Sequence, residues 1–365
     1  MDTWLLELRL KSGSLEKDKA EEIIKNVSDL IKNYLCSDCN LMYKSFNVGF
    51  LALFTSKSGI SVLVRGFEYD GVLLTLDIST PGVTNGAFKA KVSKFEKNIR
   101  LLSFVEPPRT RYFPSLPSLK RGRPFSTYDC EDGWLFEFDF DSVVFDEVSP
   151  YQHIRIMNSK QYGKCLFLDN NLNLSESDLE YTRAITGYDK EDYKDKTVLI
   201  LGGGDGGILH YLRDRCPAMI TMIDIDQIVI DAAKIHLQGI CHDALDSLSG
   251  ENYEIIISDC VVYLKKYASE KKKFDYVIND LTDIPIDVNQ SEDQIAFSRQ
   301  ILSLSMQVLK NDGKYFSHGI ALPSSVAVVE KQFQDLECRV KYTKQAVCVP
   351  SFFEFWMFYT VWKYI

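Results

Sequence analysis

Hydrophobic and polar positions alternate with two different periods in the first 120 residues. Apolar side chains recur at helical spacing between residues 23 and 34, and again between 87 and 102. Two β-rich runs, 61–65 and 72–78, lie between these stretches and are joined by Tyr69-Asp-Gly71, a hairpin signal. Five prolines between residues 107 and 124 then interrupt any regular element. The pattern predicts an N-terminal α+β domain over residues 1–120 that ends in a proline-rich linker.

The next segment is predicted to be a small antiparallel β domain, residues 121–185. Its runs 134–140 and 153–157 alternate strictly between apolar and polar positions, which is typical of strands. A third run, 164–169, ends in an asparagine-rich turn.

From about residue 186 the rhythm changes to short apolar strands separated by helical stretches. The apolar runs are 197–201, 219–223, 253–257, 274–278 and 313–316. Such strands with helices between them indicate a parallel sheet covered on both faces. Two final β-rich segments, 346–349 and 355–362, favour an antiparallel hairpin at the sheet edge. We predict an α/β fold: a Rossmann-like, methyltransferase-type domain over residues 186–365, with ligands at the carboxyl ends of its strands.

Composition narrows the class of protein. With 365 residues, 45% hydrophobic and 25% charged, the chain is typical of a soluble protein of two or three domains. No apolar run is long enough to span a membrane, the N-terminus lacks signal-peptide features, and nine scattered cysteines do not form a disulfide framework. These features favour a cytoplasmic protein without a membrane partner.

Charge and metal-ligand spacing exclude further classes. Residues 1–120 carry a net charge of +4 and residues 121–365 one of −13, a field that disfavours nucleic acid and attracts cations. Cys36-Ser-Asp-Cys39 is a lone C-x-x-C without a second pair, and no H-E-x-x-H occurs, so we expect no metal site.

Candidate chemistry gathers at the carboxyl ends of the predicted parallel strands. The first strand runs into a glycine loop, Gly202-Gly-Gly-Asp-Gly-Gly207, where backbone and ligand can approach closely. Acids follow each of the next three strands, and topology places them all on one edge. The expected nucleoside-binding set is Gly202, Gly203, Gly204, Asp224, Asp226 and Asp259. Taken singly, each acid could instead cap a helix, and Asp205 could form the turn, but acids at consecutive strand ends favour a shared site.

Asp205 determines which nucleoside fits the loop. Its carboxylate would repel a pyrophosphate, which disfavours dinucleotides. It would also repel the carboxylate of S-adenosylmethionine, by about 4 kcal/mol at 4 Å and an effective dielectric near 20. Decarboxylated S-adenosylmethionine lacks that group, and its ammonium would be attracted instead.

These motifs, taken in order, resemble the aminopropyltransferase (polyamine synthase) family, and within it the spermine-forming branch. Further matching segments are Ser149–Ile154, Ser175–Arg183, Asn279–Thr282 and Val349–Trp356. The resemblance covers about residues 125–365. The longer N-terminal domain fits the spermine-forming branch in size.

The resemblance implies roles for individual residues. Asp280 would be the catalytic proton acceptor, with Asp205 beside it holding the attacking amine. Gln152 and Cys260 would join the nucleoside-binding set. The polyamine channel would be formed by Tyr181, Asp205, Asp280, Phe352, Glu354 and Trp356.

The resemblance also implies the partners. Decarboxylated S-adenosylmethionine would be a co-substrate, with no further cofactor, and spermidine the acceptor. The N-terminal domain would resemble the adenosylmethionine decarboxylase proenzyme and form a homodimer.

Three residues depart from the family pattern: the first bears on the ribose contact, the second on contact with the polyamine, and the third on acceptor choice. Asp224 stands where the family usually has the longer Glu, Phe352 stands where the channel usually has Tyr, and Asp283 is an acid that spermine-forming members typically lack. Spermidine or thermospermine synthesis is therefore an alternative. More distant ones are an S-adenosylmethionine-dependent methyltransferase and an inactive polyamine-sensing homologue.

The implied reaction makes one electrostatic demand. An amine with a pKa of about 10.4 costs about 4.6 kcal/mol to present unprotonated at pH 7. We therefore expect burial and like-charge repulsion to raise the pKa of Asp280, so that it can accept the proton.

Overall fold

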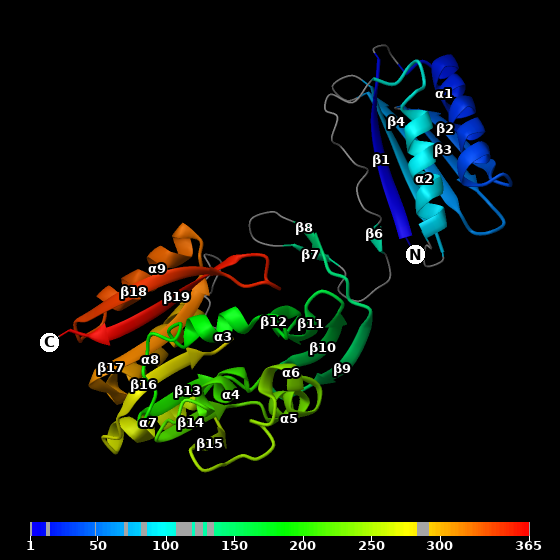
Figure 1. Cartoon of the computed structure of the whole chain (residues 1–365). Helices are drawn as coiled ribbons and strands as arrows, with labels where there is room; N and C mark the ends of the chain where they lie inside the picture. The colour runs from blue at the N-terminus through cyan, green and yellow to red at the C-terminus, as the bar shows by residue number, and fades with distance from the viewer. Residues whose placement is uncertain are drawn as a thin grey trace. The chain divides into compact units, whose positions relative to one another are not determined.

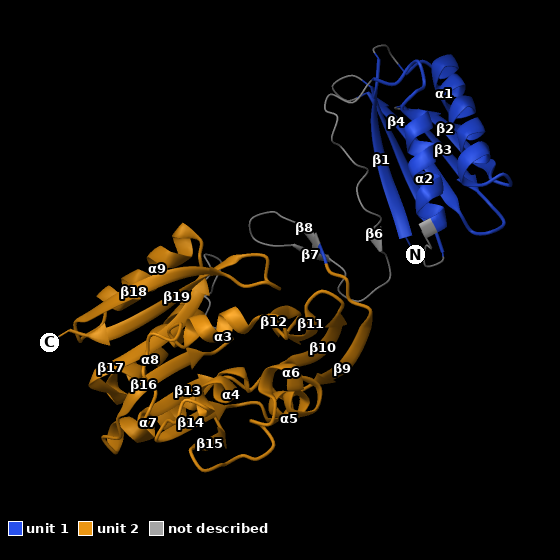
Figure 2. Cartoon of the chain, in the orientation of Figure 1, with its two compact units in different colours: residues 1–137 blue, residues 138–365 orange. Residues whose placement is uncertain are grey.

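The computed structural model describes residues 2–11, 15–47, 49–68, 72–81, 86–106, 119–120, 127–129, 135–282 and 292–364 (Figure 1). They fall into two compact units, residues 1–137 and 138–365 (Figure 2). The small sheet predicted within residues 121–185 lies in the second unit. In the described part of the chain, no helix combines the length and apolar character needed to cross a membrane.

The first unit is an antiparallel sheet with two helices on one face. Its elements are β1 (Asp2–Leu10), α1 (Lys17–Leu30), a π-helical turn (Ile31–Leu35), β2 (Asn40–Asn47), β3 (Gly49–Thr55), β4 (Ser61–Glu68), β5 (Val72–Thr80), α2 (Gly86–Ile99), β6 (Leu119–Lys120), β7 (Thr127–Asp129) and β8 (Leu135–Glu137). The strand order is β2-β3-β4-β5-β1-β6, and β7 pairs with β8 separately. The helices bury their apolar stripes against alternate residues of the strands.

Most predicted elements of this unit are confirmed. Both helices form, and β4 pairs with β5 in antiparallel register. The turn Tyr69–Gly71 and nearly all of the proline-rich linker lie outside the described residues. Strands β2 and β3 were not predicted.

The strand predicted for residues 134–140 is shorter in the structure. Trp134 lies outside the described residues, and β8 ends at Glu137. Phe138 and Phe140 stack on each other with centroids 4.8 Å apart and also contact Phe353 and Phe167. Packing of these two rings in the second unit takes the place of further strand pairing.

The second unit combines a small antiparallel sheet with a large mixed one. Its elements are β9 (Ser142–Val148), β10 (His153–Ser159), β11 (Gly163–Leu168), β12 (Asn171–Ser175), α3 (Leu179–Ile185), β13 (Thr197–Gly202), α4 (Gly207–Arg213), β14 (Met219–Asp224), α5 (Gln227–His236), α6 (Gln238–Cys241), β15 (Tyr253–Ile257), α7 (Cys260–Ser269), β16 (Phe274–Asp280), α8 (Glu292–Val308), β17 (Leu309–Ile320), α9 (Pro323–Gln334), β18 (Val340–Cys348) and β19 (Phe355–Lys363). The small sheet has the order β12-β11-β10-β9 and is antiparallel, as predicted.

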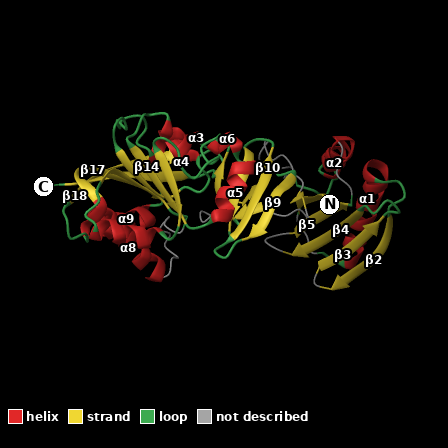
Figure 3. Cartoon of the chain, turned by 90° about the horizontal axis from the view of Figure 1, so that it is seen from below, coloured by secondary structure: helices red, strands yellow, loops and turns green. Residues whose placement is uncertain are grey.

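The large sheet has the order β15-β14-β13-β16-β17-β19-β18. Strands β13 to β17 are parallel, and β19 and β18 add an antiparallel hairpin at the edge. Alternate residues of β13 enter opposite cores: Val198 and Ile200 pack on one face, Leu199 and Leu201 on the other. Helices α3 and α4 cover one face, and α8 and α9 the other (Figure 3). The predicted Rossmann-like fold is confirmed.

The parallel register sets the position of the candidate site. Gly202 of β13 pairs with Asp280 of β16, and Asp224 of β14 pairs with Ile257 of β15. The glycine loop and the acids that follow the strands therefore share one edge of the sheet, as strand topology alone requires.

Candidate active site

The glycine loop has a backbone that only glycine adopts readily. Gly202, Gly203 and Gly206 have φ values of +82°, +83° and +77°. A Cβ atom on Gly202 would lie 2.4 Å from the carbonyl oxygen of Asp280. The loop therefore packs directly against the end of β16, so its glycines bring the two strand ends together.

Asp205 has a local structural role in this loop. Its Oδ1 accepts a hydrogen bond from the Gly207 amide at 2.7 Å, at the start of α4. Burial raises the pKa of the Asp205 carboxyl even though this bond opposes the shift. Asp205 therefore has the turn-forming role that the sequence offered as an alternative. This role uses Oδ1, and Oδ2 takes no part in the bond to Gly207.

Asp280 lies at the centre of the candidate site with a side chain that is 8% exposed. The Tyr181 hydroxyl donates to its Oδ1 at 2.5 Å. Burial, and secondly the negative charge of Asp205, raise the pKa of Asp280 well above its usual range, while the Tyr181 bond lowers it. The expected elevation of this pKa is confirmed, and burial is its larger cause.

Asp224 approaches the loop from the neighbouring strand. Its Oδ2 accepts from the Gly204 amide and its Oδ1 from the Asp226 amide, both at 2.9 Å. A Cβ on Gly204 would lie 2.8 Å from Oδ2, so this contact requires glycine. Burial raises the pKa of Asp224 to about 6. The short side chain is thus held against the loop by two backbone donors.

Asp226 is buried, and its carboxylate joins the large sheet to the small one. Its Oδ1 caps α5 through the Ile228 amide, and its Oδ2 accepts from the Ser149 hydroxyl at 2.6 Å and from the Gln152 amide group at 2.9 Å. Asp226 therefore holds Gln152 and the β9–β10 turn against the large sheet. A direct nucleoside contact by Asp226 stays a prediction.

Asp259 and Cys260 begin α7. Asp259 is the N-cap, and its Oδ1 accepts from the Val261 amide at 2.8 Å. Cys260 is buried, and desolvation raises the pKa of its thiol to about 12, which keeps it protonated at neutral pH. Their role at the nucleoside stays a prediction.

The predicted channel residues form an aromatic cluster beside Asp280. The Phe352 ring lies 6.3 Å from the Tyr181 ring and 5.1 Å from the Trp356 ring, between centroids. Glu354 is half-buried in the turn that precedes β19. The structure therefore brings Phe352 and Trp356 together with Tyr181.

A buried acid that was not predicted holds this turn in place. Asp178, at the start of α3, accepts from the Ser351 amide at 3.0 Å, from the Ser351 hydroxyl at 2.5 Å and from the Ser175 amide at 2.7 Å. The turn that carries Phe352 and Glu354 is thereby joined to the helix that carries Tyr181. Asp178 stands in the Ser175–Arg183 motif, but no sequence spacing indicated this contact across 173 positions.

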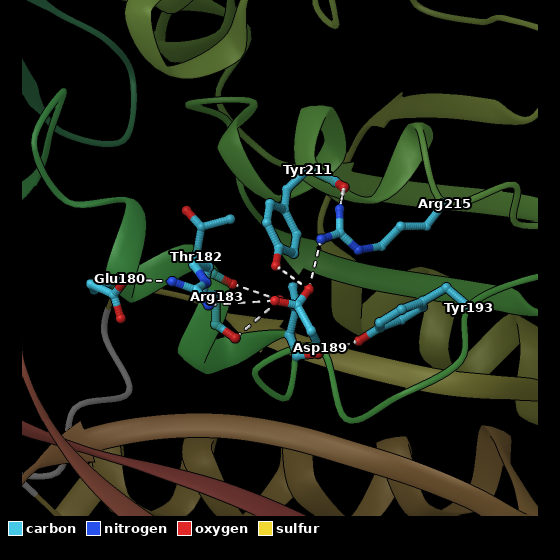
Figure 4. A network of polar contacts seen from close by, with 8 residues as sticks. Glu180, Thr182, Arg183, Asp189, Tyr193, Tyr211 and Arg215 are labelled. Carbon is cyan, nitrogen blue, oxygen red and sulfur yellow. Dashed lines mark hydrogen bonds and ion pairs between the residues drawn. The ribbon is translucent and has the colours of Figure 1, made fainter.

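A second network joins α3 to α4 (Figure 4). Asp189 accepts from the Tyr211 hydroxyl at 2.7 Å and from Arg215 at 2.8 Å, and pairs with Arg183 at 3.5 Å. Arg183 also binds Glu180, beside Tyr181. The helix that presents Tyr181 is thus connected to the helix that follows the glycine loop.

His318 of β17 is a further site residue that the sequence did not indicate. Its ring lies 5.5 Å from the Tyr181 ring, and its Nε2 is 3.9 Å from Asp280 Oδ1. Asp283, which bears on acceptor choice, lies outside the described residues.

Comparisons with known proteins agree with this architecture. The family described as spermine/spermidine synthase domain matches residues 178–364, and that described as spermidine synthase tetramerisation domain matches residues 124–176. A spermine synthase of Saccharomyces cerevisiae is 33% identical over 156 residues, 41% of this chain and 51% of the yeast protein. A polyamine aminopropyltransferase of Thermoanaerobacter sp. (strain X514) is 31% identical over 160 residues, 43% of this chain and 55% of the relative.

These matches are partial. The chain spans about half the length of these two curated relatives. The solved spermidine synthase of Thermotoga maritima has a TM-score of 0.49 at 20% identity, covering 63% of this chain and 74% of that one.

The fold and the acidic, glycine-lined edge define a Rossmann-like protein with a candidate ligand site at the carboxyl ends of its parallel strands. The spermine/spermidine synthase domain family matches residues 178–364, more than half of this chain, so the chain belongs to that family. The resemblance of the motifs to the polyamine synthase family is confirmed.

Proposed function

We propose that this protein transfers an aminopropyl group from decarboxylated S-adenosylmethionine to spermidine, which gives spermine and methylthioadenosine. The observation that carries this proposal is the buried Tyr181–Asp280 pair beside Asp205 at the glycine loop. Membership of the family supports aminopropyl transfer, and the yeast spermine synthase among the relatives supports the spermine product.

The donor would lie along the carboxyl edge of the sheet. Asp224 and Asp259 would accept hydrogen bonds from the ribose and the adenine amino group, and Gln152, held by Asp226, would contact the nucleoside from the small sheet. Asp205 would attract the aminopropyl ammonium and disfavour a donor that retains its carboxylate.

The reaction would be an in-line displacement. The amine nitrogen forms a bond to the methylene next to the sulfonium, and the carbon–sulfur electron pair leaves with sulfur as neutral methylthioadenosine. The product nitrogen then loses one proton to the ionised Asp280 carboxylate. Its raised pKa brings the carboxylate closer to the proton affinity of the amine, which makes the transfer less uphill.

The acceptor would lie against the aromatic cluster. Tyr181, Phe352 and Trp356 would pack its methylenes and attract its cationic nitrogens through their ring faces. Glu354 would pair with an ammonium farther along the chain of the acceptor. Spermidine and thermospermine synthesis remain alternatives, since they use the same donor site.

A product assay by mass spectrometry tests the proposal. Purified protein receives decarboxylated S-adenosylmethionine with either putrescine or spermidine, and S-adenosylmethionine replaces the donor in a control. We expect methylthioadenosine and a tetraamine from spermidine, identified as spermine by chromatography against thermospermine. Turnover of putrescine alone would assign spermidine synthesis, and methyl transfer from S-adenosylmethionine would overturn the proposal.

We also propose a homodimer formed through the first unit. On the face of its sheet opposite the helices, half-buried leucines recur at alternate positions: Leu51, Leu53, Leu63 and Leu73. Light scattering of the full chain should give twice the monomer mass. A stable monomer would contradict this assembly, and a tetramer would require a second interface.

A further inference from the structure

His318 is a buried histidine whose ring nitrogens have no hydrogen-bond partner among the described residues. Its side chain is 5% exposed. The indole nitrogen of Trp356 is likewise buried and lacks a partner within the described part of the chain, and the two rings lie 5.3 Å apart. Buried polar atoms are costly without a partner, so several together beside a candidate site point to a ligand.

The distance between His318 and Asp280 is suited to a bridging atom. His318 Nε2 lies 3.9 Å from Asp280 Oδ1, which is too long for a hydrogen bond between them. One nitrogen placed between the two atoms would lie within hydrogen-bond distance of both, at about 2.8–3.0 Å. An amine with two N–H groups supplies the two donors that this arrangement needs.

The groups that face His318 bring only one full negative charge. Asp280 approaches from β16 and the Tyr181 hydroxyl from α3, while β19 contributes the uncharged rings of Trp356 and Phe358. Burial lowers the pKa of His318 to about 4, so the imidazole is neutral at pH 7. A neutral imidazole accepts an N–H without favouring the ammonium form as strongly as a second carboxylate would.

We propose that His318 is a catalytic residue that binds the reacting nitrogen of the acceptor in its unprotonated form, between Nε2 and the Asp280 carboxylate. This role rests on the proposed aminopropyl transfer. Different groups then bind the different nitrogens of the acceptor. Carboxylates bind the ammonium groups that do not react, while His318 accepts a hydrogen bond from the reacting amine and leaves it uncharged. Asp280 alone takes the proton after the carbon–nitrogen bond has formed.

Three substitutions at this position separate hydrogen bonding from charge. His318→Gln keeps a neutral acceptor and should retain kcat within about fivefold, whereas His318→Leu removes it and should lower kcat by about tenfold or more. His318→Glu adds a carboxylate that favours the ammonium form, so it should lower both the acceptor KM and kcat, each by about tenfold. The donor KM should be the same in all three variants.

His236→Gln is the matched control. His236 lies on α5 with its ring against Phe145, and this substitution should change neither constant. Melting temperatures and methylthioadenosine affinity establish that each variant is folded. If His318→Leu does not fold, His318→Phe replaces it, since this keeps a flat ring against Trp356.

The outcomes distinguish this inference from the proposed function. No aminopropyl product from the unsubstituted protein refutes the proposed function and this role with it. Product formation with the same kcat and acceptor KM in the folded Leu or Phe variant refutes the His318 role alone. An increase of kcat in His318→Glu would also refute it, because a second carboxylate would then aid the nucleophile.

Discussion

Tyr181→Phe is the most direct perturbation of the candidate proton acceptor. It removes the hydroxyl that donates to Asp280 Oδ1 at 2.5 Å and keeps the ring in place. A buried hydrogen bond to a charged group contributes about 1.5–3 kcal/mol. Because this bond stabilises the ionised carboxylate, its loss should tighten proton binding at Asp280 roughly 10- to 160-fold, at about 1.36 kcal/mol per tenfold.

The assay is the pH dependence of kcat/KM for the acceptor, with saturating donor. Asp280 must be ionised to accept the proton, so activity falls on the acidic side as it becomes protonated. In Tyr181→Phe the acidic limb should move to higher pH by about one to two units, and activity should largely recover above it. Because the native state binds the Asp280 proton more tightly than the unfolded chain, this proton stabilises the fold at low pH, and the stabilisation is lost as pH rises. In Tyr181→Phe the free energy of unfolding should therefore continue to decline up to a higher pH than in the unsubstituted protein.

Tyr193→Phe is the matched control. Tyr193 is also buried, and its hydroxyl donates to the Thr186 carbonyl at 2.9 Å rather than to a carboxylate. It should cost about 1 kcal/mol of stability and leave the pH profile unchanged. A uniform loss of activity in Tyr181→Phe without movement of the acidic limb would refute the reasoning, as would movement to lower pH.

Three further predictions concern the donor edge and the turn before β19. Because Asp224 has a pKa of about 6 and is ionised above it, methylthioadenosine affinity measured by calorimetry should weaken up to about tenfold per pH unit below 6, and a flat profile would contradict a ribose contact. Gly204→Ala places a Cβ 2.8 Å from Asp224 and should raise the donor KM, whereas Gly319→Ala, with its nearest neighbour at 3.9 Å, should not. Asp178→Ala removes the acceptor of four hydrogen bonds, two of them donated by Ser351. Urea denaturation should show a loss of about 2–4 kcal/mol, and unchanged stability would mean that this contact does not hold the turn.

The sequence by itself determined the type of fold and the location of the candidate site. Buried parallel strands are apolar throughout, so β13 to β16 stand out as short hydrophobic runs. The carboxyl ends of parallel strands must lie on one edge, which placed Asp205, Asp224 and Asp280 together without any knowledge of distances. The sequence interpretation left out strands β2 and β3, which pair with each other, and β3 also pairs with β4.

Only the tertiary structure decided what each polar group does at that edge. Asp226 has the spacing of a ligand-binding acid, yet its oxygens are used by Ser149, Gln152 and the cap of α5. His318 follows an ordinary strand pattern, and its relevance comes from the Asp280 carboxylate 3.9 Å away on the neighbouring strand. Hydrogen bonds and desolvation depend on distances of a few ångströms between residues far apart in the chain. A local sequence pattern does not indicate those distances, so these contacts could be identified only from the packing of the folded chain.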